Sequence, residues 1–129
     1  MSKSPDGPRE PEDVLPLTPA TMNILLSLVD EERHGYGIMQ EVSRRTGGGI
    51  KLGPGTLYTS VKRMIFEGLI EESDERPDPE MDDRRRRYYR LTNFGQRVLS
   101  VEVERMERLV QEARTRGVSP RPRTSPEGA

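Results

Sequence analysis

The sequence contains no cysteine, no tryptophan and a single histidine, and these scarcities exclude several classes of site. Without cysteine there is no disulfide, thiolate metal centre or cysteine nucleophile. His34 has no second imidazole with which to share a metal ion or a catalytic proton, so we interpret it as a capping or packing residue. No paired-carboxylate motif or nucleophile elbow is visible either. We therefore expect no metal, no other cofactor and no enzymatic activity.

Long apolar runs are also missing. No stretch approaches the roughly 18 consecutive apolar residues of a membrane span, and the first thirteen residues lack the apolar segment of a signal peptide. We expect a soluble, cytoplasmic protein without membrane contact. Its 129 residues have room for one domain, and 31% hydrophobic against 33% charged residues fits a small domain that completes its core by oligomerising.

Two loops resemble ligand-binding patterns but lack essential residues. Gly48 and Gly53 have the spacing of the first and last glycines of a phosphate-binding loop, but Pro54 and Gly55 follow where lysine and serine or threonine are required. The acidic loop from Glu75 to Asp83 lacks the turn glycine and closing glutamate of a calcium loop. We interpret its carboxylates as partners for the arginines that follow.

Charged, proline-containing segments lie at both ends of the chain, and helical patterns lie between them. We expect disordered tails at residues 1–15 and 117–129, a folded domain at residues 16–92 and a long helix at residues 93–116. Within the domain, apolar spacing predicts three helices, at residues 19–30, 35–46 and 54–67.

The ends of these helices have recognisable signals. Thr18 is the expected N-cap of the first, with Pro19 at its first position, and three glycines stop the second. A short extended stretch at residues 50–52 precedes the third. One buried face of that third helix is predicted to carry Leu57, Val61, Met64 and Ile65.

A β-hairpin should follow the third helix. Its strands are expected at Leu69–Ser73 and Arg85–Leu91, with Arg87 and Tyr89 facing the core. The order of helix, helix, short strand, helix and hairpin is that of a helix-turn-helix with a wing. The predicted fold is therefore mainly α with a small β-hairpin (α+β), a winged helix-turn-helix followed by a long C-terminal dimerisation helix.

The outer surface of the third helix carries polar and basic side chains. A helix offered to the major groove of DNA approaches base edges most closely with its N-terminal residues. A polar helix face is more often simply solvated, so the helix alone does not decide the question. The candidate contacts on this helix are Thr56, Tyr58, Thr59, Lys62 and Arg63.

A dense run of arginines stands on the rising side of the hairpin. Although the net charge is only −1, binding to nucleic acid depends on where cations lie rather than on their sum. Guanidinium groups are always charged and fork onto phosphate oxygens, which suits a phosphate clamp or an insertion into the minor groove. The candidate residues are Arg84, Arg85, Arg86 and Arg87.

The final helix is expected to begin after the cap Thr92 and to extend to about Arg116. Phe94, Val98 and Val101 offer one face for packing on its own domain. A second apolar seam has the spacing of helix-helix contacts, which favours self-association. Its residues are Leu99, Val103, Met106, Val110 and Ala113.

Four short motifs in order resemble the PadR-like family of transcriptional regulators. They are His34-Gly35-Tyr36-Gly37-Ile38, Gly55-Thr56-Leu57-Tyr58, Glu67-Gly68-Leu69-Ile70 and Arg87-Tyr88-Tyr89-Arg90-Leu91-Thr92, the last followed by Gly95. The resemblance spans about residues 17–113, and the single C-terminal helix is similar to the shorter branch of the family. Each motif is weak alone, but the four in this order and spacing are specific.

The resemblance implies a homodimer that binds double-stranded promoter DNA at a palindromic operator, typically as a repressor. It implies that the first and last helices pack across the two-fold axis, which adds Leu25 and Leu28 to the expected dimer interface. Some relatives are relieved by phenolic acids or hydrophobic drugs at that interface, so a small-molecule effector there is left open. Half-sites would lie about 34 to 36 Å apart or a multiple of that.

Two features depart from the family pattern. The wing loop from Glu75 to Asp83 is longer and more acidic than usual, and no tryptophan supplies an aromatic platform for drugs. Two other interpretations therefore stay open. One is a winged-helix module that binds a protein rather than an operator, and the other is a ligand sensor whose DNA binding is vestigial.

Overall fold

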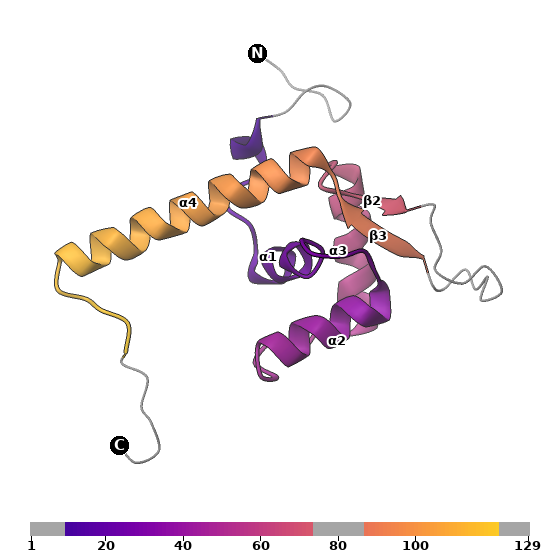
Figure 1. Ribbon diagram of the computed structural model, residues 1–129, viewed down its shortest axis with the longest axis horizontal. Coiled ribbons are helices and arrows are strands. Elements are labelled where there is room, and N and C mark those ends of the chain that lie inside the picture. The colour runs from indigo at the N-terminus through magenta and orange to yellow at the C-terminus, as the bar shows by residue number, and fades with distance from the viewer. Residues whose placement is uncertain (1–9, 74–86, 122–129) are drawn as a thin grey trace.

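The computed structural model describes residues 10–73 and 87–121 of the chain. Helices dominate it (Figure 1), and the described residues also form one small sheet of three short strands. In chain order the elements are the 3-10 helix η1 (Pro11–Val14), α1 (Pro19–Leu26), β1 (Arg33–His34), α2 (Gly35–Arg45), α3 (Pro54–Phe66), β2 (Ile70–Ser73), β3 (Tyr88–Leu91) and α4 (Asn93–Thr115). The predicted fold class, mainly helical with a winged helix-turn-helix and a long last helix, is confirmed.

The sheet is antiparallel, with β3 between β1 and β2. Tyr89 in the central strand pairs with Arg33 on one side and Glu72 on the other. The short strand expected at residues 50–52 was wrong: those residues form no strand, and the third strand is β1, immediately before α2. The position makes physical sense because a two-stranded hairpin leaves one edge of β3 without backbone partners, which β1 supplies.

Three helices begin with a side-chain cap. Thr18, His34 and Thr92 each accept a hydrogen bond from the backbone N–H three residues ahead, at 3.1, 3.0 and 2.9 Å. Each cap satisfies one of the N–H groups that a helix start leaves without a partner. The expected roles of all three residues are confirmed, including that of His34, whose imidazole Nδ1 is the acceptor.

The core lies where α1, α2, α3, the sheet and the start of α4 meet. Its members are fully or almost fully buried, and they come from every one of these elements: Ile24, Leu25, Leu28, Ile38, Val42, Leu57, Val61, Met64, Leu69, Ile70, Tyr89, Val98 and Leu99. Burial of this apolar surface is the main force that holds the elements together. Ile65 was expected in this core but is 38% exposed, because the buried face of α3 is narrower than predicted.

Helix α1 is shorter than expected, since it ends at Leu26 rather than near Asp30. The Ser27 hydroxyl donates to the carbonyl of Ile24 at 2.6 Å, and the Arg33 Nε donates to the carbonyl of Ser27 at 2.7 Å. These two bonds satisfy carbonyls that a longer helix would have used. The chain can therefore turn early and enter β1.

The N-terminal segment is also more ordered than expected. Within the predicted tail of residues 1–15, Pro11–Val14 form η1, and Pro11 is buried. The turn lies beside α4, and Val14 and Leu15 pack against the core. Apolar contact thus overrides the proline-rich composition that predicted disorder here.

Helix α4 is held to this segment by a buried carboxylate. Glu102 is 0% exposed, accepts the Leu17 N–H at 3.0 Å and pairs with Arg105 at 2.6 Å. The hydrogen bond from Arg105 lowers the pKa of Glu102, with help from the Leu17 N–H and against the opposing effect of burial. The carboxylate therefore stays charged and fixes α4 against the chain that leads into α1.

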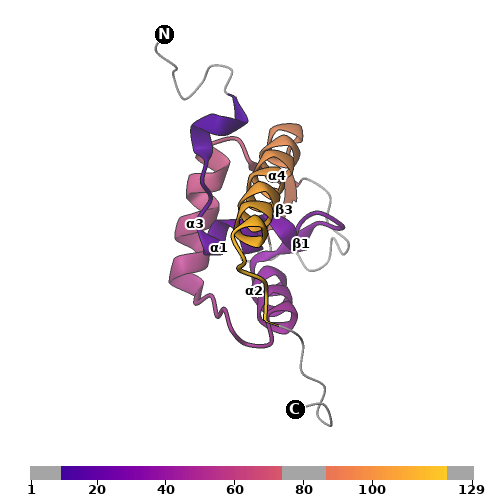
Figure 2. The same cartoon turned by 90° about the vertical axis from the view of Figure 1, so that its left-hand side faces the viewer.

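The C-terminal half of α4 extends well past the rest of the domain, as Figure 1 shows from the side and Figure 2 almost end-on. The expected packing of its first turns is confirmed, with Val98 buried and Phe94 half-buried. Farther along, apolar residues stay exposed. Within the described part of the chain, no helix combines the length and apolar character that a membrane crossing requires.

Candidate nucleic-acid interface

Helix α3 presents two contrasting faces. It begins at Pro54, whose fixed backbone suits the first helical position, and it buries Leu57, Val61 and Met64. The outer half of the helix is exposed and carries the side chains proposed from the sequence: Thr56, Tyr58, Thr59, Lys62 and Arg63. The structure therefore brings these five residues together on one convex surface.

Tyr58 has a second role at this surface. Its side chain is 38% exposed, yet its hydroxyl lies against the first residue of α2. A β-carbon built on Gly35 would stand 2.5 Å from the Tyr58 hydroxyl oxygen and 2.9 Å from its ring. A side chain at position 35 would have to displace the Tyr58 ring, so close packing of Tyr58 on Gly35 helps to set how closely α3 approaches α2.

Phe66 was missed by the sequence reasoning. It is 64% exposed and stands four residues after Lys62 and seven after Thr59, so helical geometry places the three on one stripe. A phenyl ring this exposed at the end of a polar stripe is available for apolar contact. The signal was present in the sequence, because Phe66 falls outside the spacing of the buried face.

The base of the wing is built from paired charges. Arg87 pairs with Glu72 at 3.2 Å, and Arg90 pairs with Glu71 at 2.9 Å and with Glu32 at 3.8 Å. Arg84, Arg85 and Arg86 lie outside the described residues, as does the acidic loop of residues 75–83. The partners of Arg87 and Arg90 thus come from β2 and from the loop before β1.

Arg87 departs from its expected orientation. It precedes β3 rather than lying within it, and its side chain is 52% exposed rather than facing the core. Tyr89 is 4% exposed, as predicted, and burial together with the Glu72 carboxylate raises its pKa. The shorter strand leaves Arg87 at the surface, where its charge is available to a ligand.

His34 joins the wing to α2. Besides capping α2, its ring meets that of Tyr88 edge-on, with centroids 5.3 Å apart and planes at 76°. His34 and Tyr88 are also backbone neighbours across β1 and β3. The start of α2 and the base of the wing are therefore fixed to each other beside α3.

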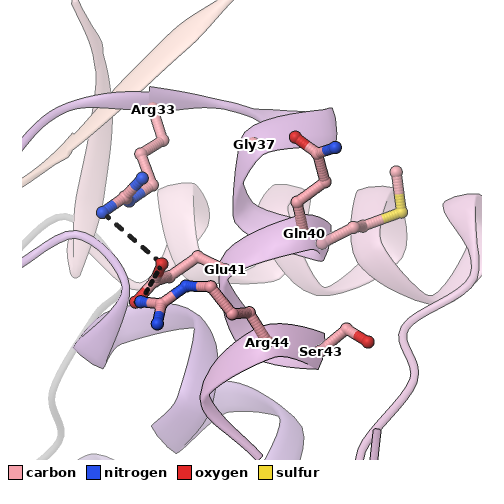
Figure 3. A pocket seen from close by; sticks show the side chains of 7 residues that line it. Arg33, Gly37, Gln40, Glu41, Ser43 and Arg44 are labelled. Carbon is pink, nitrogen blue, oxygen red and sulfur yellow. Dashed lines mark hydrogen bonds and ion pairs between the residues drawn. The ribbon is translucent and has the colours of Figure 1, made fainter. Parts of the chain in front are cut away.

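An open depression of about 690 Å³ lies along α2, and ion-paired side chains form part of its lining (Figure 3). Arg33 and Arg44 both point toward Glu41, at 3.9 and 2.8 Å. The hydrogen bond from Arg44 lowers the pKa of Glu41. Arg33 also lies 3.7 Å from Asp30 and 3.5 Å from Glu31, so carboxylates balance the guanidinium charge on this side of α2. Among the described residues, no cluster of three or more histidine or acidic side chains could hold a metal ion.

The predicted seam of α4 is exposed over most of its length. Val103, Met106 and Val110 are 41%, 36% and 46% exposed, and Ala113 is partly exposed. Leu99, at 4%, already packs on its own domain. The exposed part of the seam is an apolar surface on a helix that extends beyond the domain.

The residues expected from α1 must be corrected. Leu25 and Leu28 are 0% and 3% exposed, because they fill the core of the subunit and have no surface left to offer a partner. The neighbouring Leu26 and Val29 are exposed instead, at 37% and 50%. In α1 a rotation of only about 100° separates the adjacent residues Leu25 and Leu26, and the run of apolar residues did not reveal which of them faces inward.

A groove of about 420 Å³ connects these surfaces. It lies between the end of α1 and the first half of α4, and its lining combines four apolar with four polar or acidic side chains: Leu26, Val29, Leu99 and Val103, and Gln96, Ser100, Glu104 and Glu107. Farther along α4 a second depression of about 580 Å³ includes Met106 and Val110. The two form one continuous apolar face.

Comparison with known proteins gives consistent matches. Residues 24–101 match the model of the family described as "Transcriptional regulator PadR-like family". Transcriptional regulator Rv3488 of Mycobacterium tuberculosis is 36% identical over 91 residues, which cover 70% of this chain and 78% of the relative.

Solved structures share the fold. RosR of H. salinarum superposes with a TM-score of 0.57 at 29% identity, over 78% of this chain and 80% of that one. A PadR family transcription regulator from Clostridium difficile gives a TM-score of 0.59 at 24% identity, over 74% and 94% of the two chains. The second likeness, below 25% identity, concerns the fold alone.

Proposed function

The chain belongs to the PadR-like family of transcriptional regulators, and from that premise we propose that it acts as a homodimeric repressor on a palindromic operator. Family membership makes it a regulator that binds DNA through a winged helix rather than an enzyme. The observation that supports the finer proposal most directly is the outer face of α3, where threonine, lysine and arginine side chains stand exposed, together with the exposed Arg87 at the base of the wing.

We propose α3 as the helix that reads the major groove. Thr56 and Thr59 lie in its first two turns, which approach base edges most closely, and Lys62 and Arg63 follow. Tyr58 supports the helix against α2 and leaves part of its ring exposed. Phe66 extends the stripe, and its phenyl group suits an apolar contact with a thymine methyl group.

We propose the wing as a clamp on the DNA backbone. Arg87 and the preceding Arg84, Arg85 and Arg86 supply guanidinium groups that fork onto phosphate oxygens. In the absence of DNA, Arg87 is paired with Glu72. DNA must therefore compete with a carboxylate for this arginine, so the ion pair reduces what Arg87 contributes to DNA binding.

The dimer is proposed to form through the exposed apolar face of α4. Val103, Met106, Val110 and Ala113 form its seam with Leu99 at the base, and Leu26 and Val29 extend it over the end of α1. A helix that projects from its domain with an exposed apolar seam gains by burying that seam against a second copy. Such a dimer places two α3 helices symmetrically, as a palindrome requires.

The groove of about 420 Å³ also supports an effector site, because small-molecule sites in proteins span roughly 300–1000 Å³. Glu104 and Glu107 in its lining disfavour an anionic phenolic acid and favour a neutral hydrophobic molecule. Such a ligand would act where the proposed dimer forms and could shift the two α3 helices.

Fluorescence anisotropy with the DNA upstream of the protein's own gene tests the proposal. We expect binding much tighter than to a scrambled duplex of equal length, and loss of transcription from that promoter when the protein is added. Equal affinity for both duplexes would reject the operator. A protein partner bound by the basic face, with negligible DNA affinity at physiological salt, would instead favour the interaction-module alternative.

A further inference from the structure

One hydroxyl group connects the end of α3 with the start of α4. The Thr92 Oγ1 lies 2.5 Å from the carbonyl oxygen of Gly68 and 3.1 Å from that of Leu69, so it donates its proton to this pair of carbonyls. The same oxygen accepts the Gly95 N–H at 2.9 Å. Thr92 is thus an N-cap whose hydroxyl also contacts the residues that terminate another helix.

The backbone reinforces this joint. The Thr92 N–H donates to the Leu69 carbonyl at 3.1 Å. Gly68 closes α3 with a φ of 80°, which favours glycine, and the following N–H of Leu69 returns to Met64 at 2.9 Å. Gly95 lies so close to the Leu69 carbonyl that a β-carbon there would overlap it. The end of α3 and the first turn of α4 are therefore in direct contact through backbone as well as side-chain groups.

An ordinary cap does not have this arrangement. Thr18 caps α1 in the same way, but its hydroxyl donates to Thr21 Oγ1 within the same helix, at 3.0 Å. Thr92 instead donates to carbonyls of a segment more than twenty residues earlier in the chain. Capping alone does not require those acceptors. Thr18 is therefore an example of a cap within one helix, whereas Thr92 caps α4 and also bonds to the residues that end α3.

The direction of α4 has a large effect at its far end. With a rise of about 1.5 Å per residue, Val110 lies roughly 27 Å along the helix from Thr92, and a tilt of about 10° moves it by roughly 5 Å. One base-pair step of duplex DNA is only about 3.4 Å. A tilt of about 10° at this joint therefore displaces a reading helix by more than the rise of one base-pair step.

We propose that the Thr92 hydroxyl is a positioning group that fixes α4 relative to α3 and thereby sets which half-site spacing the dimer accepts. This inference rests on the proposed homodimer on a palindromic operator. In a dimer joined through α4, the separation and phase of the two α3 helices depend on the angle at this joint. A loose joint would accommodate operators whose half-sites are one step too near or too far.

The test compares operators that differ only in spacing. Dissociation constants are measured for the preferred palindrome and for versions with one base pair inserted or removed between the half-sites, using the full chain. The variants are Thr92→Val, which removes the hydroxyl at constant shape, Thr92→Ser, which keeps it, and Thr18→Val, which removes a cap without a bridge. Binding to a single half-site is measured in parallel.

For wild type, Thr92→Ser and Thr18→Val we expect a one-base-pair change to weaken binding by roughly tenfold, as much as a lost base contact. For Thr92→Val we expect the same one-base-pair change to weaken binding by no more than about threefold, and we expect its affinity for a single half-site to equal that of wild type. If Thr92→Val fails to fold, Thr92→Asp, which can still cap, replaces it with the same expectation.

A Thr92 variant that folds and keeps the wild-type spacing preference overturns the proposal. Equal loss of preference in Thr18→Val would also overturn it, because loss of a cap alone would then suffice. If wild type binds no operator, the proposed function itself fails and the joint has no spacing to set. That outcome differs from the one in which wild type binds the operator and the Thr92 variants keep its spacing preference, which overturns only the role of Thr92.

Discussion

The hydroxyl of Tyr58 and the α-carbon of Gly35 approach so closely that a β-carbon at position 35 would stand 2.5 Å from that oxygen. The two residues belong to separate sequence motifs more than twenty positions apart. Their contact fixes the distance between the start of α2 and the second turn of α3. The pair therefore positions the helix that we propose to read DNA.

Gly35→Ala should displace α3 and destabilise the fold. Added methyl groups at tightly packed positions cost about 1–3 kcal/mol, so we expect a loss of that size in the free energy of unfolding by urea. Gly37→Ala is the matched control, because a β-carbon there would stand 3.4 Å from its nearest neighbour, His34 Cε1. Equal free energies of unfolding for the two variants would show that the Tyr58 side chain can move aside without loss of stability.

Glu102→Gln tests the buried carboxylate that holds α4 to the N-terminal segment. The substitution weakens the bonds to Arg105 and Leu17, and we expect a loss of about 1–3 kcal/mol in the free energy of unfolding at pH 7. Glu104→Gln is the control, since Glu104 pairs with Arg108 at the surface with both side chains 68% exposed. That pair should contribute less than about 1 kcal/mol.

The loss of stability in Glu102→Gln should depend on pH. Because folding lowers the pKa of Glu102, its contribution is complete above the ordinary value of 4.5 and is lost as the pH falls through the lower pKa of the folded state. The difference in unfolding free energy between wild type and Glu102→Gln should therefore shrink as the pH falls below 4.5. A constant difference down to acid denaturation would contradict this assignment.

A comparison of the predictions with the structure at particular residues shows which features the sequence can predict. Helix starts at Thr18 and Thr92 were predictable because capping depends on residues three positions apart. The amphipathic pattern of α3 likewise predicted most of its outward residues, although Ile65 was expected in the core and the exposed Phe66 was missed. Both kinds of signal are local, and the predicted fold class follows from them.

Other features depend on contacts between distant segments. Nothing local marks Arg33 and His34 as a strand, since β1 forms only because β3 offers a free edge. Similarly, Leu25 and Leu26 are both apolar, and only the packed structure decides which of them is buried. From the sequence alone, Glu102 is expected to be a surface residue of an amphipathic helix. Only the folded structure places the Leu17 N–H beside it.

The ion pair between Arg87 and Glu72 leads to a prediction about the salt dependence and the affinity of DNA binding. Arg87→Ala should remove one phosphate contact and so reduce the slope of log K against log salt by about 0.9. Glu72→Gln should free Arg87 and tighten binding by roughly twofold to fivefold, the range of an exposed ion pair. Glu112→Gln, which breaks a pair with Arg116 far along α4, should leave both quantities unchanged. An unaltered slope in Arg87→Ala would remove this residue from the clamp.

Met106→Glu should break the proposed dimer. Burying a carboxylate in an apolar seam without a partner is costly, so the hydrodynamic mass should fall to that of a single chain. Thr115→Glu adds the same charge on the opposite side of α4, where it is exposed, and should leave the mass unchanged. A dimer that persists in Met106→Glu would place the interface elsewhere.

The most direct test of the central claim is selection of bound duplexes from random DNA, followed by titration of the selected sequence against a scrambled control. We predict a palindrome bound at least about a thousandfold more tightly than the control at physiological salt. We also predict that Lys62→Ala and Phe66→Ala select a different sequence. Recovery of no common sequence, with equal affinity for both duplexes, would contradict the account.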